Sequence, residues 1–82
     1  MKQITYSRSA AKTLSRIPAD VARRIMAKVA QYAVDPDALA NNVKALTGRD
    51  GIRLRVGDWR VIMQDGTVLF VIEVGPRGSV YE

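Results

Sequence analysis

Four arginines and a tyrosine near the C-terminus are the residues whose types and spacing point to chemistry. The stretch IRLRVGDWRVIMQDGTVLFVIEVGPRGSVYE carries Arg53, Arg55, Arg60, Arg77 and Tyr81. Residues two apart on a strand project from the same face, so Arg53 and Arg55 are expected side by side. The planar guanidinium of arginine grips phosphate with two parallel hydrogen bonds. The stretch therefore predicts a face that binds a polyanion.

The charge balance of the whole chain favours the same kind of ligand. Thirteen Lys and Arg residues face eight Asp and Glu residues, which leaves a net charge of +5, and nine of the thirteen are arginine. A positive domain associates faster with acidic partners, of which nucleic acid is the foremost. A small soluble domain that binds no nucleic acid has the same composition, so this alternative stays open.

Several classes of function are disfavoured by what the sequence lacks. It contains no cysteine and no histidine, which excludes disulfides and thiolate chemistry and argues against a transition-metal site. No organic cofactor is indicated. No stretch approaches the roughly 20 apolar residues of a membrane span, and MKQITYSRSAAK has no apolar core of an export signal. We therefore expect a cytoplasmic protein without a membrane partner.

The first half of the chain predicts one short strand and two helices. Residues 2–6 alternate polar and apolar side chains, as a strand does. Ser7 or Ser9 is expected to cap a helix that runs to Arg16. A second helix is expected to begin near Pro18 and to end around Asp35, because a residue before proline avoids helical geometry. The side chains three or four apart that form its buried stripe are Val21, Ile25, Val29 and Tyr32.

The second half predicts a connector and three strands. Residues 35–51 have a weak apolar signal and indicate a loop with room for one helical turn. The pairs Gly57-Asp58 and Asp65-Gly66 predict tight turns between strands at 52–56, 59–64 and 67–74. The last strand is apolar almost throughout, which predicts a central strand buried on both faces. The expected fold is a single α+β domain over residues 1–82, in the order β-α-α-β-β-β, with both helices on one face of an antiparallel meander.

Period-two alternation also predicts which face carries the arginines. Arg53 and Arg55 oppose Leu54 and Val56 on one strand, and Arg60 with Ile62 opposes Trp59, Val61 and Met63 on the next. The apolar face is expected to pack on the helices, since burying unpaired guanidinium groups is costly. The arginines are thus expected on the open face, with Arg77 at its edge. The alternative is a merely solvated face in which Glu73 and Asp58 pair with the arginines.

At the level of motifs, the segments VKALTGRDGIRLRVGDWRVIM and VLFVIEVGPRGSVY resemble the bacterial RelE/ParE toxin superfamily, and more particularly its RelE-type ribosome-dependent mRNA endonucleases. The resemblance extends over the whole chain as one RelE-like toxin domain. It implies the toxin of a type II toxin–antitoxin system, which inhibits translation by cleaving mRNA at the ribosomal A site through 2′-hydroxyl attack, as a metal-independent endoribonuclease. The implied partners are a cognate antitoxin and mRNA on the ribosome, with contacts to 16S rRNA. ParE-like members instead inhibit DNA gyrase without cleaving RNA, and a degenerate member would bind only its antitoxin.

The resemblance also implies roles for individual residues. Arg53 and Arg55 match the basic pair that contacts the mRNA backbone and helps to activate the attacking 2′-hydroxyl. Arg60 matches the arginine that stabilises charge on the scissile phosphate, and Arg77 the arginine that assists the leaving 5′-oxygen. Tyr81 matches the tyrosine that stacks on the nucleotide or helps to deprotonate it.

Two further basic positions and the choice of base follow from the same resemblance. Lys44 and Arg49 are expected to bind RNA together with Arg53 and Arg55. An arginine stays protonated below a pH of about 12, so it is a poor general base. Tyr81, whose pKa neighbouring positive charge would lower, is therefore expected to be the base.

Overall fold

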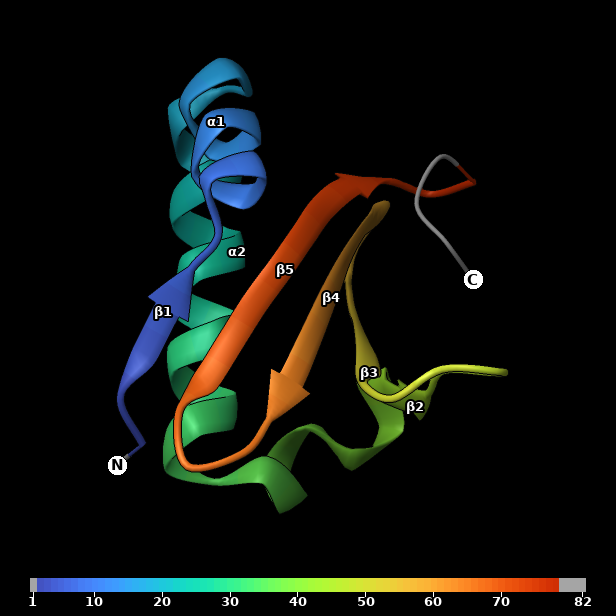
Figure 1. Ribbon diagram of the computed structural model, residues 1–82. Coiled ribbons are helices and arrows are strands. Elements are labelled where there is room, and N and C mark those ends of the chain that lie inside the picture. Colours follow the sequence, from blue (N-terminus) through green and yellow to red (C-terminus); the bar gives the residue numbers. More distant parts are fainter. Residues whose placement is uncertain (1, 79–82) are drawn as a thin grey trace.

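Residues 2–78 form a five-stranded mixed sheet with two α-helices and one 3-10 helix. The structure, a computed structural model, describes residues 2–78. The elements along the chain are β1 (Ile4–Tyr6), α1 (Arg8–Arg16), α2 (Ala19–Val34), η1 (Pro36–Asn42), β2 (Val43–Ala45), β3 (Ile52–Val56), β4 (Trp59–Asp65) and β5 (Leu69–Pro76). The strand order across the sheet is β1-β5-β4-β3-β2, with β1 parallel to β5 and the other neighbours antiparallel (Figure 1).

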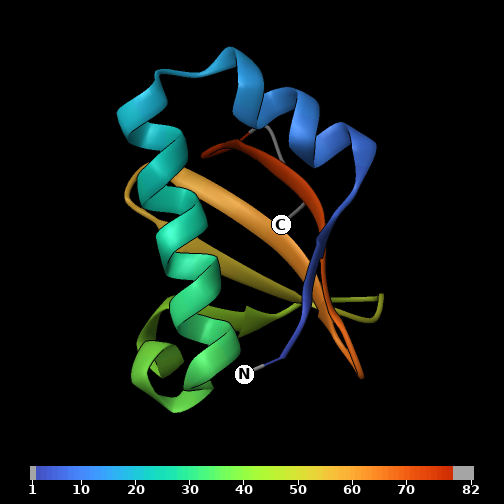
Figure 2. The same ribbon diagram turned by 90° about the vertical axis from the view of Figure 1, so that its left-hand side faces the viewer.

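Both α-helices cover one face of the sheet, as predicted for this α+β fold. Figure 2 shows α2 standing in front of the sheet and α1 crossing its upper end. Helix α1 packs against β5, and α2 packs against η1 and β3. The predicted stripe of α2 lies against the core, since Ile25, Val29 and Tyr32 are buried and Val21 is half-buried. The apolar sides of the helices and of the sheet therefore form one core.

The helix boundaries follow from local chemistry. The Ser7 hydroxyl oxygen accepts a hydrogen bond from the backbone N–H of Ala10 at 3.0 Å, so Ser7 is the cap of α1. Helix α2 begins directly after Pro18 and ends at Val34. The predicted starts and ends of both helices are confirmed to within a residue or two.

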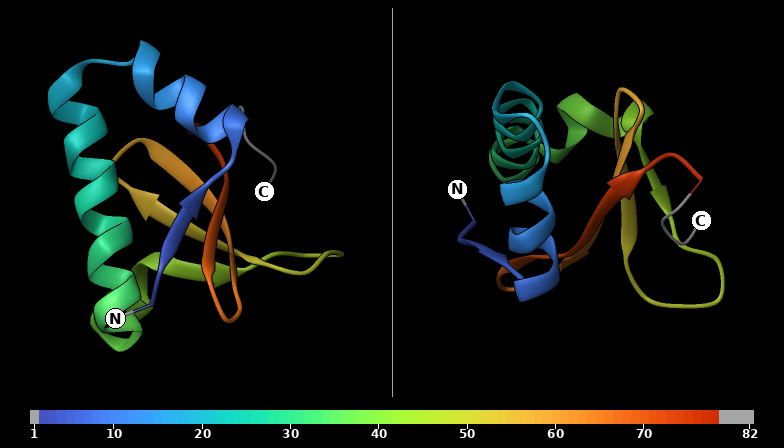
Figure 3. Two further views of the ribbon diagram at one scale, coloured as in Figure 1. Left: turned by 60° about the vertical axis from the view of Figure 1, so that its left-hand side comes forward. Right: turned by 90° about the horizontal axis from the view of Figure 1, so that it is seen from above.

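The connector contains more structure than its sequence predicts. It holds the 3-10 helix η1 and the edge strand β2, where we expected a loop with room for one helical turn. Strand β2 has three residues and owes its place to pairing with β3, so its own residues carry almost no strand signal. The connection between β2 and β3 projects away from the body of the domain (Figure 3).

The order of the sheet also differs from a pure meander. Strands β3, β4 and β5 form the predicted antiparallel meander, but β1 joins β5 in parallel and β2 extends the other edge. The middle strand is β4. The prediction that the last strand is buried on both faces is wrong, because Phe70 of β5 is 36% exposed on the face away from the helices.

One turn and one ion pair complete the frame. Gly57 and Asp58 connect β3 to β4, and Gly57 has a φ of +59°, which glycine adopts without strain. At the far end of β4, Asp65 pairs with Lys2 and accepts a hydrogen bond from the Tyr32 hydroxyl at 3.2 Å. Asp65 thus joins the segment before β1, the end of α2 and the end of β4. Within residues 2–78, no helix has the length and apolar character needed to cross a membrane.

Candidate functional site

The strand register collects the basic side chains on the sheet face opposite the helices. In one row across β2, β3, β4 and β5 the paired residues are Lys44, Arg53, Ile62 and Glu73. In the next row but one, Arg55 pairs with Arg60. The row between them consists of Val43, Leu54, Val61 and Val74, all of which belong to or pack on the core. Alternate rows point to opposite faces, so the predicted separation of a basic and an apolar face is confirmed for β3 and β4.

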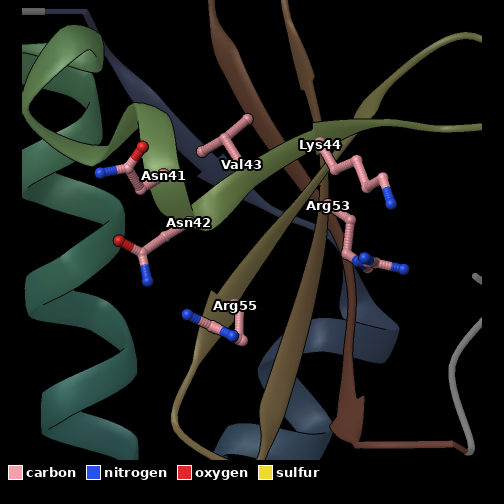
Figure 4. A pocket seen from close by; sticks show the side chains of 6 residues that line it. All are labelled: Asn41, Asn42, Val43, Lys44, Arg53 and Arg55. Atoms are coloured by element: carbon pink, nitrogen blue, oxygen red, sulfur yellow. The ribbon is translucent and has the colours of Figure 1, made fainter.

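A shallow pocket lies where β2 and β3 meet the end of η1. It has a volume of ≈ 260 Å³ and is lined by Asn41, Asn42, Val43, Lys44, Arg53 and Arg55 (Figure 4). Pockets that enclose a drug-sized ligand span roughly 300 to 1,000 Å³, so this one is suited to hold part of a larger ligand. Three of its six side chains are cations. The pocket thus has the charge to hold the phosphate of an extended polyanion.

The three cations of the pocket approach it from two strands. Lys44 and Arg53 are direct partners on β2 and β3, and their side chains extend toward the same side in Figure 4. Lys44 and Arg55 are exposed, whereas Arg53 is half-buried. Three of the predicted site residues therefore line one pocket, with Arg55 extending to the opposite side from Lys44 and Arg53 in Figure 4.

Arg60 is buried, which differs from the expected open position. Arg60 is 8% exposed, and its Nη1 donates hydrogen bonds to the carbonyl oxygens of Gly57 at 3.2 Å and of Trp59 at 3.1 Å. Carbonyl partners offset the cost of burying a guanidinium group. Arg60 therefore ties its charge to the turn between β3 and β4, next to its strand partner Arg55.

The remaining predicted residues lie elsewhere or outside the described part of the chain. Arg77 is exposed after β5, and its backbone N–H donates to the carbonyl of Asp58 at 2.7 Å, which places it beside the β3–β4 turn. Arg49 is exposed in the connection between β2 and β3 and is not among the residues that line the pocket. Tyr81 lies outside residues 2–78, so its expected role as a base stays a prediction.

Glu73 also lies on this face, which the sequence predicted only in the alternative of a solvated face whose arginines pair with Glu73 and Asp58. Ile62 pairs with Glu73 while the adjacent Met63 pairs with Val71, so Ile72 is an extra residue on β5 and forms a β-bulge. Simple alternation from Leu69 and Val71 would have sent Glu73 to the core and Val74 to the open face. The bulge reverses this, because Val74 is 4% exposed in the core and Glu73 is half-buried in the row of Arg53. One signal was visible in the sequence, since alternation would have buried the only acid of an apolar strand.

The comparisons with known proteins identify the family. The family model described as the ParE toxin of type II toxin–antitoxin system, parDE, matches residues 4–81. The chain belongs to this family. It is therefore a toxin of a type II toxin–antitoxin system within the RelE/ParE superfamily, as the motifs predicted.

Solved structures confirm the fold of this ParE-family toxin. The archaeal RelE–RelB complex from Pyrococcus horikoshii superposes with a TM-score of 0.75 at 23% identity, over 96% of this chain and 98% of that chain. The intact Escherichia coli RelBE toxin–antitoxin complex gives 0.71 at 23% identity, over 93% and 96%. The isolated Escherichia coli RelE toxin gives 0.70 at 22% identity, over 98% and 88%. No curated protein sequence matches the chain significantly.

Proposed function

We propose that this toxin inhibits translation by cleaving mRNA in the ribosomal A site. The observation that carries the proposal is the pocket on β2 and β3 that Lys44, Arg53 and Arg55 line together. Single-stranded nucleic acid is held by a positively charged groove that follows its backbone. A face with three cations at one pocket, and with Arg60 and Arg77 toward the β3–β4 turn, matches that requirement.

The chemistry needs preplaced positive charge more than any other group. Attack of a 2′-hydroxyl on the neighbouring phosphate concentrates negative charge on a crowded phosphorane, and donors fixed in advance stabilise it. Loss of one such donor commonly lowers the rate by about 10² to 10³. Arg53 and Arg55 are the candidates for this role in the pocket. Arg60, which the β3–β4 turn holds in place, is proposed to stabilise charge on the scissile phosphate, and Arg77 to assist the leaving 5′-oxygen.

A cognate antitoxin is the second proposed partner. Two of the structurally similar toxins were solved in complex with RelB antitoxins, and an antitoxin that covers the basic face would neutralise its charge. We propose that such an antitoxin silences this toxin in the cytoplasm. Contacts with 16S rRNA are proposed for the same basic surface, including Lys44 and Arg49.

A gyrase inhibitor is the alternative, and the family match favours it. The matching family model is that of the ParE toxin, and ParE-like members poison gyrase without cutting RNA. Such a function needs no proton transfer, so the absence of histidine from the sequence is no obstacle to it.

In vitro translation with mapping of mRNA 5′ ends separates the two functions. The proposed nuclease cuts mRNA at codon-dependent positions in the presence of ribosomes, and Arg53→Gln with Arg55→Gln reduces cleavage by at least about 10²-fold. Arg23→Gln, an exposed arginine of α2, is the matched control and keeps full activity. Intact mRNA together with inhibited DNA supercoiling would replace the nuclease by the gyrase inhibitor, and neither effect would leave a protein that binds only its antitoxin.

A further inference from the structure

We propose that Glu73, in place of Tyr81, is the general base that removes the proton from the attacking 2′-hydroxyl. This inference rests on the proposed nuclease function and names a residue that the motifs did not supply. The carboxylate of a glutamate is a hydrogen-bond acceptor and a proton acceptor, which the guanidinium groups around it are not. Among residues 2–78, Glu73 is the only acid that a strand projects onto the basic face.

The β-bulge is the structural reason why Glu73 is there. Leu69, Val71 and Val74 all face the core, so the alternation of β5 shifts by one residue at Ile72. Bulges are over-represented beside active sites, where they redirect a side chain. Here the bulge redirects the one acid of an otherwise apolar strand into the row that holds Lys44 and Arg53.

Ser7 holds this bulge from the other end of the chain. Its backbone N–H donates to the carbonyl oxygen of Val71 at 2.9 Å, and its hydroxyl donates to the carbonyl oxygen of Ile72 at 2.6 Å. A bulge leaves its extra residue without a partner in the ladder, and Ser7 supplies that partner. Because Ser7 also caps α1, the position of Glu73 is coupled to the packing of α1 on the sheet.

The charges that face Glu73 come from β3 and β4. Arg60 is its diagonal neighbour on β4, at the roughly 7–8 Å typical of such pairs. Arg53 lies one strand further, beyond the fully buried Ile62, which corresponds to about 10 Å between strands. On the other side β1 ends at Tyr6, opposite Val71, so no residue of β1 pairs with Glu73. No ion pair of Glu73 exists within residues 2–78. Its carboxylate is proposed to accept the proton from one side, while the cations of β3 and β4 hold the phosphodiester from the other.

The proposed step balances in protons and bonds. The carboxylate of Glu73 takes the proton of the 2′-hydroxyl while the 2′-oxygen forms a bond to phosphorus. The bond from phosphorus to the 5′-oxygen breaks, and that oxygen takes a proton from water. The products are a 2′,3′-cyclic phosphate and a 5′-hydroxyl end, and no metal or cofactor takes part.

The test is single-turnover cleavage of mRNA in the A site of purified ribosomal complexes. Glu73→Gln keeps the size and the hydrogen-bonding ability of the side chain and is expected to cut 10² to 10⁴ times more slowly, which is the usual contribution of a general base. The control Asp20→Asn makes the same charge change at an exposed position of α2 and is expected to cut at the rate of the unmodified toxin. Thermal unfolding of each variant shows whether it is folded.

Two further measurements separate a base from a structural acid. The rate of the unmodified toxin is expected to fall at low pH, and Glu73→Gln is expected to lose this fall. A substrate with sulfur in place of the 5′-oxygen needs no acid for its leaving group, so it is expected not to rescue Glu73→Gln. If the unmodified toxin cuts and folded Glu73→Gln cuts equally well, or is rescued by the sulfur substrate, Glu73 is not the base. If the unmodified toxin itself does not cut, the proposed function fails instead.

Discussion

Replacing the half-buried Ser7 by alanine is expected to destabilise the toxin far more than replacing an exposed serine would. The change removes two hydrogen bonds of the hydroxyl, one accepted from the N–H of Ala10 and one donated to the carbonyl of Ile72. Loss of a serine cap costs about 1 kcal/mol, within a range of about 0.5–2. Leaving the part-buried carbonyl of the bulge without its donor costs roughly 1–3 kcal/mol more.

Together these losses amount to about 2–4 kcal/mol, a large share of the roughly 5–15 kcal/mol that stabilises a typical domain. For a domain of this size each kcal/mol lowers Tm by about 4–8 °C, so a decrease of at least about 8 °C is expected. Circular dichroism during thermal and urea unfolding measures both quantities. Because the backbone N–H of Ser7 still donates to Val71, the fold itself is expected to survive.

Two matched variants control this experiment. Ser9→Ala changes an exposed serine within α1 and is expected to change the free energy of unfolding by less than about 0.5 kcal/mol. Ser7→Thr keeps the hydroxyl and is expected to retain most of the stability. If Ser7→Ala unfolds within about 0.5 kcal/mol of the unmodified toxin, the hydroxyl holds neither the helix nor the bulge, and the reasoning is refuted.

Three further predictions concern a glycine, a tyrosine and the pocket. Gly51 has a φ of +122°, and a Cβ there would lie 2.9 Å from the carbonyl oxygen of Met63, so Gly51→Ala is expected to lower the free energy of unfolding in urea by more than Gly48→Ala, whose Cβ meets no atom within 4 Å. Burial, then the charge of Asp65 and the hydrogen bond to it, raise the pKa of Tyr32 above its ordinary 10.0. The folded state therefore holds this proton more tightly, so stability is complete below about pH 10 and falls as the pH rises further; Tyr32→Phe is expected to reduce this fall in urea unfolding, whereas an unchanged slope would contradict it. Arg55→Gln removes an exposed cation from the pocket and is expected to reduce the salt dependence of single-stranded RNA binding by about 0.7 in the slope of log K against log salt, measured by fluorescence anisotropy, while Arg23→Gln leaves the slope unchanged.

Much of the fold was predictable because its signals are local. The cap at Ser7, the stripe of α2 and the glycine turn after β3 each depend on residues a few positions apart, and all three are present in the structure. Strand β2 had no such signal, since three residues at the end of a polar connector become a strand only by pairing with β3. The parallel pairing of β1 with β5 likewise joins segments more than sixty residues apart.

The sequence by itself determined the net charge and the basic face of β3, because alternation along a regular strand is a property of its covalent geometry. It placed Arg53 and Arg55 together, and the pocket that they share with Lys44 agrees with that prediction. Only the tertiary structure decided that Arg60 is buried against a turn and that Glu73 faces the arginines. The reason is that a bulge interrupts alternation, and this bulge lies in the pairing of β5 with β4 and is held by Ser7, sixty-five residues away from Ile72 along the chain.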